Sequence, residues 1–263
     1  MSFSLASNLK DLLNFSKGKD IRNLEVNKMK NVIKALIFDV DGTLSETEEL
    51  HRKAFNCAFK EKKLDWVWDF NLYKKLLNVA GGMERIDYFQ KKLSIGKTIL
   101  TQKEIKFIHQ RKTFLYNSWV KKGSLELRPG IKKIITMAKK KEIILAISTS
   151  TSFENVVSLV RACFNEDPGK LFFFISTGEL VSKKKPYPDL YKLVLKNISV
   201  QPSECFAFED SRLGLLSSKA AKIPTIVSPS IYNLNDDFSE ADYVLESFNY
   251  NFLPLALRNR LSF

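Results

Sequence analysis

One segment, residues 35–44, constrains the fold of this chain more than any other. It begins with four apolar residues, Ala35–Phe38, and such a run suits a strand that is buried on both faces in the middle of a parallel sheet. The apolar run stops at Asp39, Asp41 follows, and Gly42 allows a sharp turn before a predicted helix. Because open α/β sheets bind ligands at the carboxyl ends of their strands, this pattern predicts a binding site here.

The two aspartates offer hard oxygen ligands, which can hold Mg²⁺ against a substrate phosphate. A plainer interpretation is a polar loop that carries two acids by chance, since Asp-Gly is a common turn signal. The buried strand directly in front of the pair favours the binding site.

Length and composition indicate a soluble globular protein. The 263 residues can form one large domain, or a core with a smaller second domain. Hydrophobic residues make up 44% and charged residues 27%, and no apolar run is long enough to span a bilayer. Cys57, Cys163 and Cys205 are odd in number, far apart and without a CxxC pair, so they indicate neither a disulfide framework nor a zinc site but a reducing compartment.

The net charge of +13 raises the alternative of a non-catalytic, basic nucleic-acid-binding protein. Against it, lysines are spread through the chain in short runs such as residues 139–141 and 183–185, and the aromatic residues mostly lie at core spacing. We therefore expect a solvated basic surface and no nucleic-acid partner. Its positive field would still attract an anionic, phosphorylated substrate.

Residues 1–31 differ from the rest, since they are rich in Ser, Asn and Lys. We expect an N-terminal extension that is either a targeting segment or disordered. Leu9, Leu12 and Leu13 would form a short amphipathic turn at most. The acids at positions 11, 20 and 25 are unusual for a transit peptide.

Apolar residues recur at helical spacing from residue 47 to residue 121, which predicts a helical bundle inserted after the first strand. The breaks in the pattern fall at residues 79–82 and 93–96. Beyond the insert, strands and helices alternate, which argues for a doubly wound parallel sheet. The predicted strands are 142–147, 171–175, 205–208 and 225–227, and the predicted helices are 131–141, one around 156–160, one from 189 to about 195, and 211–221.

A polar cluster lies close to each predicted strand end, so the fold would gather these clusters at one edge of the sheet. Asp39 can attack phosphorus and form an aspartyl-phosphate. Asp41 can protonate the leaving oxygen and then activate water. Ser148 and the amides near it can bind the phosphoryl oxygens, and Lys185 supplies a fixed positive charge.

Glu209 and Asp210 would complete an oxygen-rich pocket for Mg²⁺. Each cluster alone has a plainer interpretation. The Glu-Asp pair suits a helix N-terminus, Ser148 suits a helix cap, and Lys185 lies in a run of three lysines. The order of all four clusters in one α/β chain favours a single site.

This order resembles the haloacid dehalogenase (HAD) superfamily of phosphotransferases, over roughly residues 33–245. Longer segments resemble the CbbY family of xylulose-1,5-bisphosphate phosphatases, which occurs in organisms with Rubisco and removes an inhibitor of that enzyme. The segments that carry this closer resemblance are residues 46–56, 81–86, 161–164, 184–186 and 188–191.

The resemblance implies an α/β fold, a doubly wound parallel-sheet HAD core formed by residues 32–46 and 123–263, with a helical cap at 47–122. It implies Asp39 as the nucleophile, Asp41 as the acid and base, and Mg²⁺ held by Asp39, the Asp41 backbone carbonyl, Glu209 and Asp210.

The cap would contact the distal part of the substrate. The Gly81-Gly82 loop can approach a ligand closely, and His109 and Lys112 share a helix face. Met83 stands where the CbbY pattern usually has Lys, and Lys222 where the superfamily commonly has Gly at a helix end. The expected substrate-binding residues are Glu48, His51, Gly81, Gly82, Met83, Glu84, Arg85, His109, Lys112, Ser148, Thr149, Ser150 and Lys185.

A β-phosphoglucomutase or a phosphoglycolate phosphatase of the same superfamily is the nearest alternative. The resemblance favours a sugar-bisphosphate substrate, Mg²⁺ as cofactor, and no membrane partner. We expect a monomer in the plastid stroma, with the cytoplasm as the alternative location.

Overall fold

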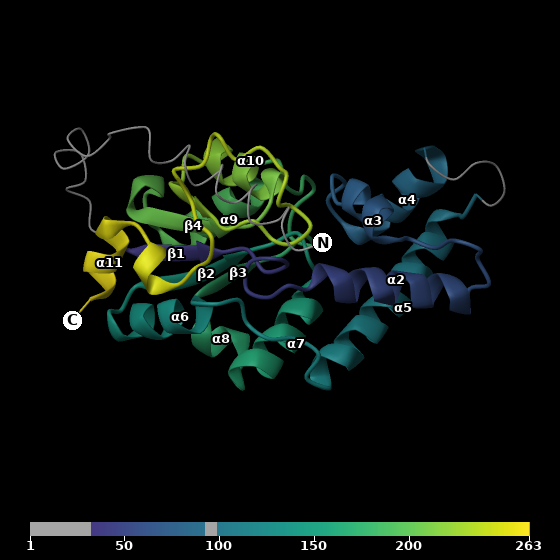
Figure 1. The fold of residues 1–263 in the computed structure, drawn as a ribbon, viewed down its shortest axis with the longest axis horizontal. Coiled ribbons are helices and arrows are strands. Elements are labelled where there is room, and N and C mark those ends of the chain that lie inside the picture. The colour runs from purple at the N-terminus through teal and green to yellow at the C-terminus, as the bar shows by residue number, and fades with distance from the viewer. Residues whose placement is uncertain (1–32, 93–98, 263) are drawn as a thin grey trace, which may run out of the picture.

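The computed structural model describes residues 33–92 and 99–262. In this part of the chain, six parallel strands form one sheet in the order β3-β2-β1-β4-β5-β6 (Figure 1). This sheet confirms the predicted fold class. The strands are β1 Ala35–Phe38, β2 Ile144–Ser148, β3 Phe174–Ser176, β4 Cys205–Glu209, β5 Thr225–Val227 and β6 Tyr243–Val244.

Helices cover both faces of the sheet because side chains along a strand point alternately to opposite faces. Leu36 and Phe38 of β1 pack on one face with residues of α6 (Ile131–Lys140), α7 (Phe153–Phe164) and α11 (Leu255–Leu261). Ala35 and Ile37 pack on the other face with α9 (Asp189–Ile198). Beside α9 lies α10 (Arg212–Ala220), as Figure 1 shows. The central strand is thus buried throughout, as its apolar sequence predicts.

Four helices form a separate layer at the end of the molecule drawn on the right in Figure 1: α2 (Glu48–Glu61), α3 (Phe70–Leu76), α4 (Gly82–Lys92) and α5 (Gln102–Lys121). They enclose an aromatic cluster in which Phe55, Phe59, Trp68 and Phe89 contact one another through tilted and edge-on rings. This cluster is the hydrophobic core of the four-helix layer. The layer joins the sheet region through α5, which packs on α7.

The structure differs from the sequence-based expectations in one strand and in several shorter elements. The predicted strand 171–175 is present but shorter: a helical turn, α8 (Pro168–Leu171), takes up Leu171, and β3 begins only at Phe174. Pro168 accounts for this change, because its fixed φ suits the first position of a helix. Not predicted were β6, α11 and the 3₁₀ turns Pro202–Glu204 and Tyr250–Phe252. The predicted break at 93–96 and the extension 1–31 lie outside the described residues.

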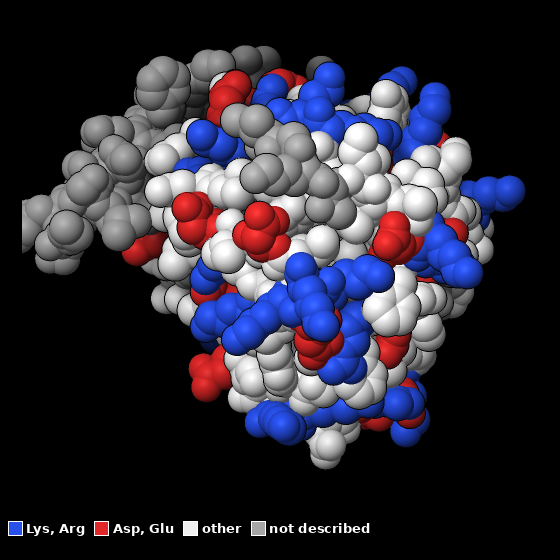
Figure 2. Space-filling model, turned by 90° about the vertical axis from the view of Figure 1, so that its right-hand side faces the viewer, with Lys and Arg blue, Asp and Glu red and all other residues white. Residues whose placement is uncertain are grey.

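Basic side chains are spread over the face that carries the four-helix layer. Figure 2 shows them in several groups, separated by acidic and uncharged side chains. None of the helices that the structure describes combines the length and the hydropathy that crossing a membrane requires.

Helix α10 ends in a motif that favours glycine. The amide of Ile223 donates to the carbonyl of Ser218 and the amide of Lys222 to the carbonyl of Lys219, which is the Schellman pattern. Lys222 has a φ of 61°, in the left-handed region. A lysine is therefore strained at the position where the superfamily commonly has glycine.

We expect Lys222→Gly to raise the free energy of unfolding by about 0.5–1 kcal/mol, because glycine adopts this φ without a Cβ clash. Urea denaturation measures the change. Lys192→Gly is the matched control: it replaces an exposed lysine inside α9 and should lower stability by about 1 kcal/mol. A loss of stability in both variants would contradict the interpretation.

Candidate active site

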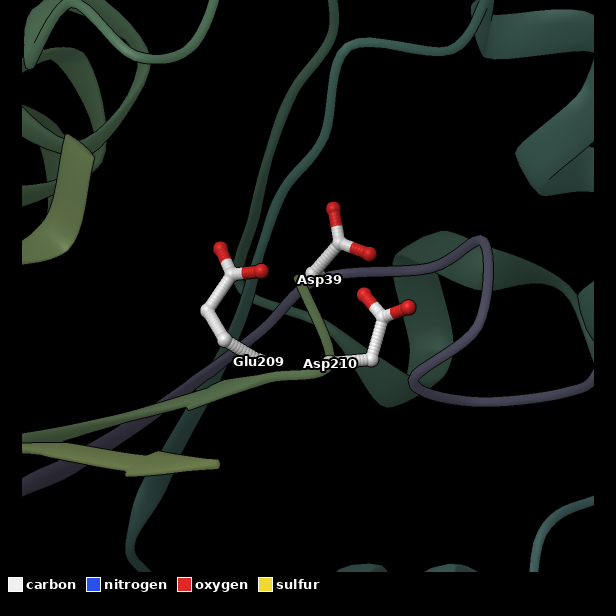
Figure 3. Close-up of side chains that lie close together, drawn as sticks. All are labelled: Asp39, Glu209 and Asp210. Atoms are coloured by element: carbon white, nitrogen blue, oxygen red, sulfur yellow. The ribbon is translucent and has the colours of Figure 1, made fainter. Parts of the chain in front are cut away.

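The ends of two neighbouring strands bring three carboxylates together. β1 and β4 are paired in parallel with Phe38 opposite Phe208, so Asp39 leaves the sheet beside Glu209 and Asp210. One oxygen from each carboxylate lies within 4.8 Å of the others. Figure 3 shows the three side chains rising from the strand ends toward a common space. All three are buried.

Lys185 lies within this cluster and is itself buried. Its Nζ donates to Asp39 Oδ1 and to Glu209 Oε1, each at 2.6 Å. The Tyr191 hydroxyl donates to the same oxygen of Glu209 at 2.5 Å. Burial would lower the pKa of Lys185, but the two carboxylates raise it above its ordinary value, so the lysine is held in its charged form.

The carboxylates are short of positive charge. Burial raises the pKa of Asp39 to about 7, although Lys185 opposes the rise. Burial likewise raises the pKa of Glu209 to about 7 against Lys185, and that of Asp210 to about 7 against hydrogen bonds that include one from Asn233. Three buried carboxylates share one buried ammonium, and burying such uncompensated charge is costly.

This arrangement fits a divalent cation. Glu209 Oε2 is buried and has no hydrogen-bond partner in the described part of the chain, so it offers a free ligand atom. Carboxylate oxygens are the ligands that Mg²⁺ prefers.

Gly42 has a φ of 84°, and a Cβ there would collide with the Asp210 carboxylate. The sharp turn after β1 thus leaves room for Asp210.

Asp41 lies in a different environment from Asp39. Its Oδ1 accepts hydrogen bonds from Thr47 Oγ1 at 2.6 Å and makes a 3.1 Å contact with His51 Nε2. Burial raises the pKa of Asp41, but His51, Thr47 and Lys112 together bring it below its ordinary value. The His51 ring is stacked on Tyr116, with centroids 3.9 Å apart, which fixes its orientation.

A cavity of about 360 Å³ lies between the strand ends and the four-helix layer. It brings together residues from both, including nearly all of the predicted site residues. Those that line it are Asp39, Asp41, Glu48, His51, Gly81, Gly82, Met83, Glu84, Arg85, His109, Lys112, Thr149, Ser150, Lys185 and Asp210. Glu209 lies behind Lys185, out of contact with the cavity.

Ser148 is not among the residues that line the cavity, and its expected contact with the substrate stays a prediction. It is still part of β2, and its side chain is fully buried in the sheet. The next two residues leave the strand, and Thr149 and Ser150 do reach the cavity. The hydroxyl of Ser150 is buried without a hydrogen-bond partner in the part of the chain described here.

The helical layer supplies positive charge at the other side of the cavity. Lys112 is buried, and its Nζ lies 4.8 Å from the Phe55 ring centroid. Among described residues it has no hydrogen-bond or ion-pair partner. Burial lowers the pKa of Lys112 to about 8, with Asp41 opposing. Burial and the nearby Lys112 and Lys184 lower the pKa of His109 to about 3, so this ring is neutral.

Arg85 is held by the helical layer itself. Its guanidinium donates to the Leu76 and Val79 carbonyls at 3.1 and 3.3 Å and to the Tyr73 hydroxyl at 2.9 Å. Tyr73 in turn donates to Glu48 at 2.8 Å. Arg85 therefore holds the loop between α3 and α4 in place, in addition to contributing a positive charge to the cavity.

Sequence reasoning missed several residues of the site. Lys184 lines the cavity and pairs with Glu84 of α4 at 2.5 Å, which links the helical layer to the loop that carries Lys185. Gly81 has a φ of 97°, and a Cβ there would collide with both partners. The resemblance over residues 184–186 is the signal that includes Lys184. The resemblance over residues 46–56 likewise includes Thr47, whereas Asn233 lies outside the segments that carried the closer resemblance.

The sequence model of haloacid dehalogenase-like hydrolases matches residues 36–228. The chain belongs to this family. The match includes both aspartates, Lys185 and the Glu209-Asp210 pair. The predicted superfamily and the predicted class of enzyme, a hydrolase, are therefore confirmed.

Within the haloacid dehalogenase-like hydrolases, the chain is similar to CbbY proteins, as the sequence segments predicted. It is 44% identical to CbbY of Cereibacter sphaeroides, over 82% of this chain and 93% of the relative. It is 38% identical to a CBBY-like protein of Arabidopsis thaliana, over 81% and 68%. A crystal structure of a CbbY variant from Rhodobacter sphaeroides with xylulose 1,5-bisphosphate is 43% identical with a TM-score of 0.80, covering 83% of this chain and 96% of that one.

We expect the purified protein to bind Mn²⁺, a spectroscopic substitute for Mg²⁺, at the three-carboxylate cluster. Glu209→Gln should weaken this binding by roughly tenfold or more, since it removes a charged ligand. Titration followed by electron paramagnetic resonance gives the affinity. Glu204→Gln is the control, because Glu204 pairs with Lys34 at the opposite end of the same strand. Equal affinity in Glu209→Gln and wild type would argue against the site.

Proposed function

We propose that this chain is a Mg²⁺-dependent phosphatase that hydrolyses xylulose 1,5-bisphosphate, and that residues 47–122 act as its cap. The observation that carries the proposal is the cavity with two unlike sides. On one side, Asp39 lies among buried carboxylates that need a dication; on the other, Lys112 is buried without an ionic partner among residues 33–92 and 99–262. A substrate with a phosphate at each end would satisfy both.

The similarity to CbbY supports the choice of sugar. The CbbY variant that resembles this chain over most of its length was crystallised with xylulose 1,5-bisphosphate. A role linked to Rubisco is part of the same proposal. The plastid stroma stays a prediction, supported by the similarity to a plant protein, and so does the monomeric state.

Asp39 is the nucleophile in this mechanism. Lys185 holds Oδ1, so Oδ2 is the oxygen that attacks phosphorus, and the bond to the leaving sugar oxygen breaks as the aspartyl-phosphate forms. Mg²⁺ bound by Asp39, the Asp41 carbonyl, Glu209 and Asp210 would neutralise charge on the phosphoryl oxygens. Lys185 contributes a further fixed charge close to the same oxygens.

Asp41 moves the protons. Thr47 and His51 both engage Oδ1, which leaves Oδ2 to give a proton to the leaving oxygen and later to take one from the attacking water. A phosphate dianion beside it would raise its pKa and so favour protonation before the first step. Together with Ser148, we propose Thr149 and Ser150, which line the cavity, as the hydroxyls that bind the phosphoryl oxygens.

The distal phosphate would lie near Lys112, with Lys184, Arg85 and His109 close to it. Met83 lines the cavity and is 39% exposed. The CbbY pattern usually has a lysine at this position, so this chain lacks that positive charge. Lys184 lies next to the same loop, beside Gly81, and supplies a positive charge from the core instead.

The test of this function is phosphate release, with Mg²⁺, from xylulose 1,5-bisphosphate, ribulose 1,5-bisphosphate, phosphoglycolate and β-glucose 1-phosphate. We expect xylulose 1,5-bisphosphate to have the highest kcat/KM, and Asp39→Asn to lose activity by roughly 10³-fold or more. Turnover of phosphoglycolate alone would show a phosphoglycolate phosphatase. Conversion of glucose 1-phosphate to glucose 6-phosphate would show a mutase. Either result would overturn the proposed substrate and keep the nucleophile.

The low pKa of Lys112 gives a pH dependence. A lysine with a pKa of about 8 is charged below that pH and neutral above it, so kcat/KM for the bisphosphate should fall as the pH rises through about 8. Asp41, Arg85 and Glu48 are the charged groups that face Lys112. Lys112→Arg keeps its charge at high pH and should flatten the profile. The same decline in Lys112→Arg as in wild type would assign the titration to another group.

A further inference from the structure

Tyr232 lies in the part of the chain that forms the α/β core, but its side chain packs inside the helical cap. It lies after β5, within residues 228–236, which we call the Tyr232 loop. Its side chain is 1% exposed and is part of the aromatic cluster of the helical layer. Every other buried member of that cluster lies between Phe55 and Ile108. The core thus extends one side chain into the hydrophobic centre of the cap.

Contacts on three sides hold the Tyr232 side chain in the cap. Its ring stacks on Phe70, with centroids 4.4 Å apart, and meets the edge of Tyr73 at 5.7 Å. Its hydroxyl donates to Glu49 Oε2 at 2.6 Å. Glu49 is itself fixed by Arg52, at 2.6 and 2.9 Å. Tyr232 is therefore attached to both α2 and α3.

The next residue, Asn233, touches the carboxylate cluster. Its Nδ2 donates to Asp210 Oδ2 and to Ser230 Oγ, both at 2.9 Å, and its side chain lines the cavity. The other oxygen of Asp210 accepts a longer bond from Thr43, at 3.4 Å. The Ser230 side chain, to which Asn233 also donates, hydrogen-bonds the same carboxylate. Asn233 and Ser230, both in the Tyr232 loop, thus orient Asp210 together.

The base of the same loop is fixed to the core. The amide of Ser228 donates to the Glu209 carbonyl at 2.9 Å. The Arg128 guanidinium donates to the carbonyls of Ser228 and Pro229 at 2.7 and 3.1 Å. Asn233 therefore follows a short segment that is attached to the core at its base and to the cap at Tyr232.

We propose that Tyr232 is a positioning residue, which couples the placement of the cap to the metal-binding geometry of Asp210 through Asn233. This inference rests on the proposed function and deepens it. When the cap is seated, Tyr232 holds Asn233 against Asp210; when the cap moves away, the end of the loop moves with it and the carboxylate loses the hydrogen bond from Asn233. Because such coupling is reciprocal, metal binding favours the seated cap to the same extent.

The experiment measures Mn²⁺ affinity by electron paramagnetic resonance in the substrate-free, full-length protein. We expect Tyr232→Ala and Asn233→Ala each to weaken binding by about tenfold, the scale of outer-shell effects on metal sites. The double variant should be no weaker than either single variant, because Tyr232 acts through Asn233. Phe70→Ala leaves the loop unchanged but removes the stacking partner, and it should weaken binding by about 2- to 10-fold.

Phe89→Leu is the matched control. It alters the same aromatic cluster through Trp66 and Trp68 and has no ring contact with Tyr232 among the described residues. It should leave Mn²⁺ affinity within about twofold of wild type, although it removes ring contacts from the cap. If Phe89→Leu weakens Mn²⁺ binding as much as Phe70→Ala does, general loosening of the cap explains the effect and the proposal is wrong.

The outcomes separate this inference from the proposed function. Mn²⁺ binding by the wild type that is lost in Asp210→Asn supports the metal site by itself. If that holds while Tyr232→Ala and Phe70→Ala both bind Mn²⁺ as the wild type does, the coupling is refuted and the phosphatase assignment stands. A wild type that binds no Mn²⁺ would refute both.

Discussion

The buried Lys185 ammonium, shared by Asp39 and Glu209, is the interaction on which the site depends. Without it, three carboxylates would meet in a buried space with no cation, which the chain could tolerate only by protonating them. One ammonium is not enough, as the raised pKa values of Asp39, Glu209 and Asp210 show. The parallel pairing of β1 and β4 forces these charges together, and even with the lysine in place the cluster fits a further cation.

The helical layer carries the complementary imbalance. Lys112 is buried over aromatic rings, and burial lowers its pKa although Asp41 opposes the change. Burial, and then the charge of Lys112, lower the pKa of His109 and keep its ring neutral. A bound anion would reverse both effects. The cavity thus has a side that needs a cation and a side that needs an anion, which is the charge pattern of a metal-assisted site for a phosphorylated substrate.

Sequence reasoning located the residues whose position follows from the strands. Asp39, Asp41, Glu209 and Asp210 lie at or next to strand ends, and a parallel sheet places such residues together whatever the rest of the fold does. Ser148 is the last residue of β2, which runs one residue further than its apolar run predicts, and a shift along a strand decides whether a side chain faces the cavity. The choice between Ser148 and its neighbours needs the strand's exact end.

The Tyr232 loop shows the limit of such reasoning. Residues 228–236 contain no helix or strand, so no periodic pattern marks Tyr232 or Asn233. Their roles depend on contacts with Phe70 and Asp210, which are far away in the sequence. Lys184 lies in a lysine run of the kind that usually forms solvated surface, and only the approach of α4 gives it a partner. Contacts between the core and the cap are tertiary, and local sequence does not encode them.

Two kinds of contact join the cap to the core near the cavity, and their magnitudes differ. The Glu84–Lys184 pair is partly solvated, with side chains 45% and 21% exposed, so it contributes at most about 1 kcal/mol. Burying an aromatic ring such as that of Tyr232 contributes about 2–3 kcal/mol and is not screened by salt. Of these two contacts, the aromatic one therefore contributes more to holding the helical layer against the core. The ion pair is weak enough for a substrate phosphate to compete for Lys184, which leaves this lysine free to respond to the ligand.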